Sequence, residues 1–246
     1  MRNAESFRIR HSALRWLARL GQSPISTATV REFRAWRESL KHMAKVLRDD
    51  GIPSDVGVGI EFGIPQSSKR IDFILSGLSE AGEPNMIIVE LKQWSSTRIS
   101  DKDGIIVARR GGSAEVEGPH PSYQAWSYAA LLQGFNEAVY GGGIALAPCA
   151  YLHNYVDDGI VTDPHYDHYV ERAPLFLKGE AELGRLRAFV KQHVRTGDNG
   201  ELLFKVEHHV EVDRLIGQRG ENVRLEHRVV ELDVVPADHE IRAAKL

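Results

Sequence analysis

Two charged side chains interrupt the apolar run "MIIVELKQW" at residues 86–94. If this run is a strand, Glu90 and Lys92 point to the same face of a sheet, because side chains alternate along a strand. Burying either charge costs several kcal/mol unless a partner compensates for it. The sequence therefore predicts that further polar groups or an ion meet Glu90 and Lys92.

Asp72 lies in the strand-like segment that precedes this run, "KRIDFILSGL" at 69–78. The turn "SEAGEPN" that joins the two segments is short, so we expect neighbouring strands on which Asp72, Glu90 and Lys92 converge. Two close carboxylates repel each other unless a cation lies between them, and Mg²⁺ (or Mn²⁺) takes such oxygen ligands. Asp72 and Glu90 would hold the ion, and Lys92 would orient or help to deprotonate a water and offset charge on a phosphate.

Glu61 and Arg70 flank this predicted site, and each has two interpretations. Glu61 is either an additional metal ligand or an ion-pair partner of Arg70 or Lys69. Arg70 either contacts phosphate or pairs with a carboxylate, and the second interpretation is slightly favoured.

A helix is predicted downstream, over "PSYQAWSYAALLQGFNEAV" at 121–139, with Pro121 suited to its first turn. Gln124 and Tyr128 are four residues apart and so share one helical face. His120 lies one step of four upstream. We expect all three to reach the site or a substrate backbone.

The elements that must position these residues alternate between helical and strand patterns. Residues 28–205 are predicted to form one α/β domain with a mixed central sheet flanked by helices. We expect a helical extension over 1–27 and a β-rich extension over 206–246, with β structure starting at about 201. The expected elements are a helix over 29–48, strands over 56–64, 69–78 and 86–94 (the last central in the sheet), the helix over 121–139, a strand with its exit loop over 141–155, and a helix over 181–194.

Composition narrows the class of protein. The 246 residues carry a formal net charge of -3, so contact with nucleic acid would need a local basic patch. Cys149 is the single cysteine, which excludes an intramolecular disulfide framework and a multi-cysteine zinc site and fits a reducing cytoplasm. No apolar stretch approaches the roughly 18 residues that span a bilayer, so no membrane association is expected.

Taken together, the motifs resemble those of the PD-(D/E)XK nuclease superfamily. Asp72 matches its first acidic position, "ELK" at 90–92 its (D/E)XK element, and "QAWSY" at 124–128 the QxxxY element of RecB-like members. The resemblance implies a restriction-endonuclease-like core and a metal-dependent nuclease, with DNA as the expected substrate.

Longer stretches, including "IIVELKQW", "HPSYQAWSYAALL" and "PCAYLHNY", are similar to the N-terminal region of a bacterial family. Its longer members continue into a Schlafen-like DNA/RNA helicase. The likeness covers about residues 28–205, and the chain contains no G-x-x-x-x-G-K-[ST] phosphate loop. An ATP-driven activity would thus need a separate helicase or ATPase, and a homodimer is left open. A non-catalytic or partner-dependent binding module that keeps the fold is the alternative to an enzyme, and an RNA-directed nuclease is a third.

Overall fold

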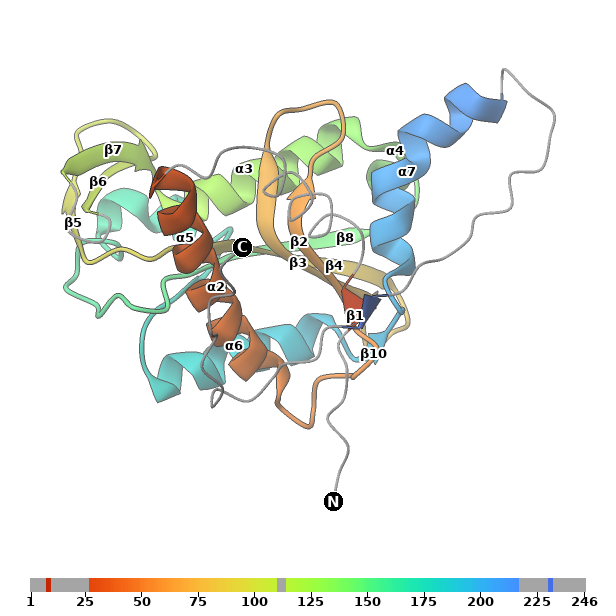
Figure 1. Cartoon of the computed structure of the whole chain (residues 1–246), viewed down its shortest axis with the longest axis horizontal. Helices are drawn as coiled ribbons and strands as arrows, with labels where there is room; N and C mark the ends of the chain where they lie inside the picture. The colour runs from red at the N-terminus through yellow and green to blue at the C-terminus, as the bar shows by residue number, and fades with distance from the viewer. Residues whose placement is uncertain (1–7, 10–26, 110–113, 217–229, 232–246) are drawn as a thin grey trace, which may run out of the picture.

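A mixed β-sheet lies between two layers of helices (Figure 1). The computed structural model describes residues 8–9, 27–109, 114–216 and 230–231. Among these residues the main sheet has the strand order β11-β1-β2-β3-β4-β8-β9, with β10 paired to β3. Its strands are β1 (Arg8–Ile9), β2 (Gly57–Gly63), β3 (Arg70–Leu78), β4 (Pro84–Leu91), β8 (Ala145–Tyr151), β9 (Leu175–Phe176), β10 (Thr196–Gly197) and β11 (Val230–Glu231). The predicted α/β class with a mixed central sheet is confirmed.

β4 is the central strand that the sequence predicts. It pairs antiparallel with β3 and parallel with β8. Ile87, Ile88 and Val89 are fully buried, because helices cover both faces of the sheet here. This position explains the nearly continuous apolar run around Glu90.

The helices divide between the two faces of the sheet. On one face, α2 (Thr27–Leu47) and α6 (Glu180–His193) bury apolar side chains against Phe73, Leu75, Ile87 and Val89. On the other face, α3 (Pro121–Phe135), α4 (Glu137–Tyr140) and α7 (Glu201–Ile216) pack on Ile74, Met86 and Ile88. None of the described helices carries an apolar stretch long enough to cross a bilayer.

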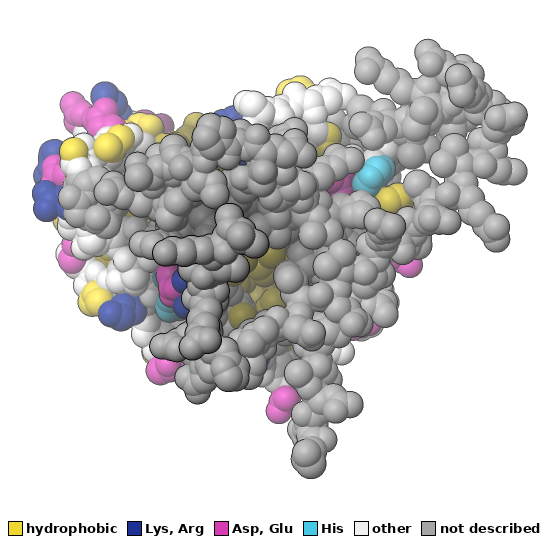
Figure 2. All heavy atoms as spheres, viewed as in Figure 1, with side chains coloured by type: hydrophobic (Ala, Val, Ile, Leu, Met, Phe, Trp, Pro, Cys, Tyr) yellow, Lys and Arg dark blue, Asp and Glu magenta, His cyan; other side chains and the backbone are white. Residues whose placement is uncertain are grey.

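The connection between β4 and α3 contains a second, smaller sheet that the sequence did not predict. Its strands are β5 (Ser96–Ile99), β6 (Ile105–Arg109) and β7 (Glu115–Pro119). Arg98 and Arg109 both pair with Glu115, and Lys102 pairs with Glu117. Figure 2 shows the resulting mixture of basic and acidic side chains at this end of the molecule. A short 3₁₀ turn (Pro164–Tyr166) and α5 (Asp167–Val170) follow β8.

The prediction of β structure from about residue 201 is wrong for 201–216, which form α7. Asp198 accepts hydrogen bonds from the amides of Gly200 and Leu202, at 2.9 Å each, and so satisfies free N–H groups at the start of the helix. Leu202, Leu203 and Val206 then face the core at helical spacing. Helical packing outweighs the local alternation of charged and apolar residues.

The predicted extensions are described only in part. α7 runs through the expected boundary at 205–206, so the C-terminal extension does not begin as β structure. Within that extension, Val230–Glu231 form β11 and pair with β1. The N-terminal segment 1–27, expected to be helical, lies outside the described residues apart from Thr27, which begins α2, and Arg8–Ile9, which form a strand instead.

The antiparallel ladder between β2 and β3 is interrupted at one position. Ile60 pairs with Phe73 and Phe62 pairs with Ile71, which leaves Glu61 opposite Asp72 without a ladder pair. Glu61 has a φ of 49°, in the left-handed region that a non-glycine residue rarely adopts. Ile71 packs with α3 and α7, whereas Phe73 packs with α2 and α6. Ile71 and Phe73, two residues apart on β3, therefore lie on opposite faces of the sheet, where regular alternation would place them on the same face.

Candidate active site

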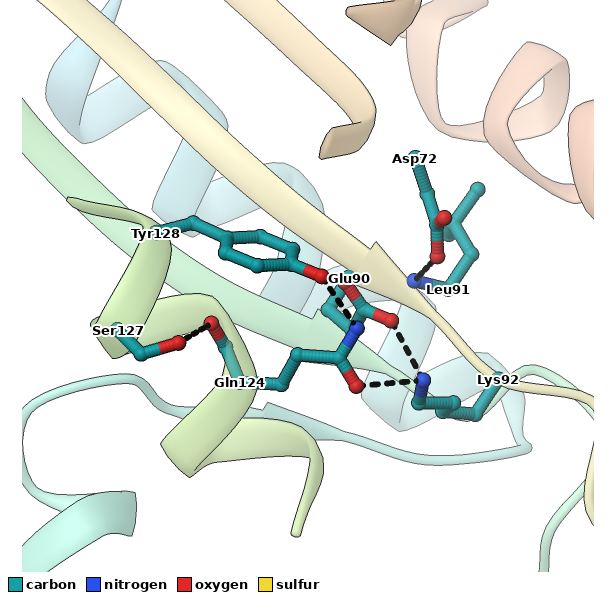
Figure 3. Close-up of polar contacts among 7 residues, drawn as sticks. All are labelled: Asp72, Glu90, Leu91, Lys92, Gln124, Ser127 and Tyr128. Carbon is teal, nitrogen blue, oxygen red and sulfur yellow. Dashed lines mark hydrogen bonds and ion pairs between the residues drawn. The ribbon is translucent and has the colours of Figure 1, made fainter. Parts of the chain in front are cut away.

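Asp72 lies at the end of the β3–β4 pairing. The last ladder pair joins Phe73 to Val89, and continuing this register places Asp72 across from Glu90. Asp72 Oδ2 accepts a hydrogen bond from the Leu91 amide at 2.9 Å (Figure 3). The side chain thus takes over a backbone contact where the ladder stops, which fixes one carboxylate oxygen beside Glu90.

Glu90 and Lys92 form a buried ion pair on the α3 side of β4. Lys92 Nζ donates to Glu90 Oε1 at 2.5 Å, and the two side chains are 11% and 1% exposed. Glu90 Oε2 is also buried, but it has no hydrogen-bond partner among the described residues. A buried carboxylate oxygen without a partner is unfavourable, so this atom is suited to receive a ligand.

Gln124 and Tyr128 extend this pair into a chain of hydrogen bonds. Gln124 Oε1 accepts from Lys92 Nζ at 2.9 Å, and Gln124 Nε2 donates to the Tyr128 hydroxyl at 2.9 Å (Figure 3). Lysine has only donors, so the amide oxygen must face Lys92 and the amide nitrogen must face Tyr128. The spacing of four residues on α3 allows one amide to link Lys92 to Tyr128.

The pKa values show how tightly the acidic groups interact. Burial, followed by the negative charge of Asp72, raises the pKa of Glu90 to about 8, although Lys92 partly offsets both effects. Asp72 acts on the pKa of Glu90 both through its charge and through side-chain proximity, so the two carboxyl groups are neighbours. Burial, then the charge of Glu90 and more weakly those of Asp72 and Glu61, raises the pKa of Tyr128 to about 12. Tyr128 therefore stays a neutral hydroxyl at physiological pH.

Glu61 and Arg70 form the ion pair that was one of the two interpretations for each of them. Arg70 Nη1 lies 3.9 Å from Glu61 Oε2, and the Arg70 side chain is 45% exposed. No three histidine, cysteine, aspartate or glutamate side chains of the described residues form a metal-binding group. The site therefore has two adjacent carboxylates, those of Asp72 and Glu90, and Glu61 stands outside them.

His120 does not join the cluster. Its ring is fully buried at the start of α3, stacks on Tyr166 with a centroid distance of 4.3 Å, and places Nε2 3.0 Å from the Val161 carbonyl oxygen. Burial lowers the pKa of His120 to about 4. The side chain holds α3 against the loop that contains Val161.

We expect His120 to make the fold sensitive to acid. Its folded pKa of about 4 is below the ordinary value of 6.5, so below pH 6.5 the unfolded chain binds a proton that the folded protein does not. The contribution of His120 to the free energy of unfolding should therefore fall as the pH decreases from 6.5 to 4. Urea unfolding of the wild type and of His120→Asn over this range should show a stability difference that shifts against the wild type as the pH falls. A difference that does not change with pH would contradict a neutral buried imidazole.

The residues present fit a divalent cation. Mg²⁺ in proteins is commonly held by one or two carboxylates together with waters and substrate phosphates. Asp72 and Glu90 are adjacent, and Glu90 Oε2 is a buried acceptor without a partner in the described part of the chain. These two side chains would hold the ion.

Two neighbours of the cluster were not assigned to the site from the sequence. Lys92 Nζ lies 5.8 Å from the Trp94 ring centroid, and the Trp94 carbonyl accepts from Asn154 Nδ2 at 2.8 Å. Lys69 Nζ lies 5.9 Å from the Tyr128 ring centroid. Only the adjacency of Lys69 to Arg70 and Asp72 in the sequence could have suggested its place.

The chain matches no family model, no curated protein and no solved structure in the comparisons with known proteins. The geometry of the site itself therefore has to support any function assigned to it.

Proposed function

We propose that the chain is a metal-dependent nuclease that hydrolyses phosphodiester bonds of nucleic acid, with DNA as the expected substrate. The observation that supports this most is the buried Glu90 beside Asp72, with Lys92 on one of its oxygens and no partner among the described residues on the other. Two adjacent carboxylates on neighbouring strands of the sheet, β3 and β4, are costly for the fold alone. They become favourable when they share a cation.

The roles of the side chains follow from their contacts. Asp72 and Glu90 would hold Mg²⁺ or Mn²⁺, which when bound supplies Lewis-acid polarisation of a phosphate oxygen and an acidified water. Lys92 presents an ammonium group that stabilises negative charge developing on the phosphate. Gln124 keeps that ammonium in place through its Oε1, and Tyr128 orients the Gln124 amide.

The proposal includes membership of the PD-(D/E)XK superfamily as a RecB-like nuclease. It is supported by the order of the motifs and by the contact between Lys92 and Gln124. A separate helicase as partner and a cytoplasmic location belong to the same proposal. The location is supported by Cys149, the single cysteine, which is a buried free thiol.

A second candidate is a non-catalytic nucleic-acid-binding module that keeps this fold. Lys92 already binds both Glu90 and Gln124 without any ligand, so the same contacts can serve to hold β4 against α3. In that case the cluster stabilises the fold and performs no chemistry.

The test incubates the protein with end-labelled single- and double-stranded DNA and RNA, in the presence of Mg²⁺, Mn²⁺ or EDTA. Cleavage with either metal and none with EDTA supports the nuclease. Binding without cleavage, unchanged by EDTA, favours the binding module. Neither binding nor cleavage of any of the four substrates contradicts both candidates.

Gln124→Ala and Tyr128→Phe should each slow cleavage about 10- to 100-fold while leaving the metal dependence nearly unchanged, as expected for groups that position a catalytic residue. Because Tyr128 contacts Lys92 only through Gln124, the Tyr128→Phe change should add little in the Gln124→Ala background. Cleavage rates measured against Mg²⁺ concentration for the single and double variants check both statements.

Ser127→Ala is the matched control, since Ser127 lies on the same helix and its hydroxyl donates to the Gln124 backbone carbonyl and not to the amide side chain. It should cleave like the wild type. Wild-type rates for Gln124→Ala and Tyr128→Phe would show that this face of α3 only packs.

A further inference from the structure

The turn between β2 and β3 holds Lys69 at a fixed place. The Ile64 amide donates to the Lys69 carbonyl at 3.0 Å, and the Lys69 amide donates to Ser67 Oγ at 3.2 Å. Ser67 Oγ in turn donates to the Ile64 carbonyl at 3.0 Å, and Gln66 adopts a positive φ of 60° that tightens the turn. Hydrogen bonds within the turn therefore fix the backbone at Lys69.

The Lys69 side chain borders the catalytic cluster. Its Nζ lies 5.9 Å from the centroid of the Tyr128 ring, and the residue is exposed. Within the described part of the chain no carboxylate forms an ion pair with it. Tyr128 connects through Gln124 to Lys92, so Lys69 is a solvent-facing cation next to the proposed chemistry.

The other residues that the sequence suggested for substrate binding are occupied in the structure. Arg70 pairs with Glu61, and His120 is buried against Val161. Gln124 and Tyr128 bind each other, and Gln124 also binds Lys92. Among the described residues at this border, Lys69 is an exposed cation without an ion pair, whereas Arg70 lies 3.9 Å from Glu61.

A polyanionic strand must approach the carboxyl groups of Asp72 and Glu90 here, and positive charge beside them favours that approach. Tyr128 and Gln124 lie between Lys69 and Lys92, and Lys92 already donates to Glu90 and Gln124. We propose that Lys69 binds the backbone phosphate next to the one that is cleaved, so that the site selects a polynucleotide strand over an isolated phosphodiester. The predicted effects on KM and kcat rest on the proposed nuclease function. The predicted effects on oligonucleotide affinity and its salt dependence require only that the protein binds nucleic acid.

The experiment compares Lys69→Ala and Lys69→Arg with Lys45→Ala. Lys45 is an exposed lysine on α2, on the opposite face of the sheet, and its removal changes the net charge equally. Fluorescence anisotropy with a labelled single-stranded oligonucleotide, in EDTA and at increasing NaCl, measures binding. Cleavage is measured on the same oligonucleotide and on bis(p-nitrophenyl) phosphate, which has one phosphate.

Lys69→Ala should weaken oligonucleotide binding about 3- to 10-fold and reduce the salt slope by about 0.7, the value of one phosphate contact on a single strand. Its KM for the oligonucleotide should rise by a similar factor with kcat within about 2-fold, because a contact away from the reacting phosphate binds ground and transition states alike. Cleavage of the small diester should not change. Lys69→Arg should keep the wild-type slope, and Lys45→Ala should bind like the wild type.

Several results would overturn the inference. One is an equal loss of oligonucleotide binding in Lys45→Ala, which would mean that the effect of Lys69→Ala comes from the change in net charge alone. Another is a loss of kcat on the small diester in Lys69→Ala, which would mean that Lys69 acts by packing on Tyr128. Absence of any oligonucleotide binding by the wild type would also overturn it. If the wild type binds the oligonucleotide but cleaves neither substrate, the nuclease proposal fails, and the binding and salt data alone decide the role of Lys69.

Discussion

Replacing Asp72 with asparagine should abolish cleavage and at the same time stabilise the metal-free protein. Asparagine keeps an oxygen that can accept from the Leu91 amide, but it removes the charge that would hold the cation. Cleavage should fall about a thousandfold or more, which corresponds to about 4 kcal/mol of transition-state stabilisation.

The stability of this variant should change in the opposite direction because Asp72 raises the pKa of Glu90. Without that repulsion, the folded protein accommodates an ionised Glu90 more readily, and we expect a gain of about 1 kcal/mol in EDTA at neutral pH. Calorimetry with EDTA and with Mg²⁺, beside cleavage assays, measures both effects.

Asp49→Asn is the matched control for Asp72→Asn. Asp49 also accepts from a backbone amide, that of Gly51 at 2.9 Å, but it pairs with Lys191 on the other side of the sheet. This variant should cleave normally and should not gain stability. Two results for Asp72→Asn would contradict this prediction: cleavage at the wild-type rate, or a lower Tm than the wild type in EDTA. Either would show that Asp72 and Glu90 do not form one charged site.

Replacing Lys92 with methionine should destabilise the metal-free protein and change its pH dependence. Methionine keeps much of the side-chain volume but leaves Glu90 and Asp72 without the buried cation. Breaking a buried ion pair from one side costs about 3–5 kcal/mol, on the order of 10 °C in Tm for a chain of this size. Cleavage should fall about 100- to 10,000-fold if Lys92 assists proton transfer or offsets phosphate charge.

The sign of the pH effect follows from the raised pKa of Glu90. Folded Glu90 keeps its proton up to about pH 8, whereas the unfolded chain loses it near 4.5, so the contribution of Glu90 to stability declines as the pH rises between these values. In the wild type the decline should level off above about pH 8. In Lys92→Met the pKa of Glu90 rises further, so the loss should continue to higher pH, and lower pH or Mg²⁺ should restore part of the Tm.

Tm values measured from pH 6.5 to above pH 8, with EDTA or Mg²⁺, test this, because His120 is neutral throughout that range. Lys45→Met, at an exposed position on α2, is the control and should follow the wild type. If Lys92→Met responds neither to pH nor to Mg²⁺, the three charged groups are not coupled.

Local sequence patterns suffice to predict the elements in which pattern and tertiary packing agree. The apolar run around Glu90 predicts a central buried strand, and the position of β4 between β3 and β8 confirms it. The spacing of Gln124 and Tyr128 predicts one face of a helix, and in α3 both side chains join one chain of hydrogen bonds. Periods of two and of four residues are local properties, so they can be recognised without knowing what the element packs against.

Packing between elements, in contrast, sets which charged side chains meet and which segments form a helix or a strand against their local pattern. Residues 201–216 form α7 because Asp198 caps the start of the helix. The apolar cluster on this face of the sheet then buries Leu202, Leu203 and Val206. Lys69 reaches Tyr128 because a tight turn brings it back over α3, although about sixty residues separate them in the chain. Pairing between β2 and β3 leaves Glu61 opposite Asp72 with a positive φ, yet directs its carboxylate to Arg70. Contacts of this kind depend on the geometry between elements, which the residue types and their spacing along the chain do not specify.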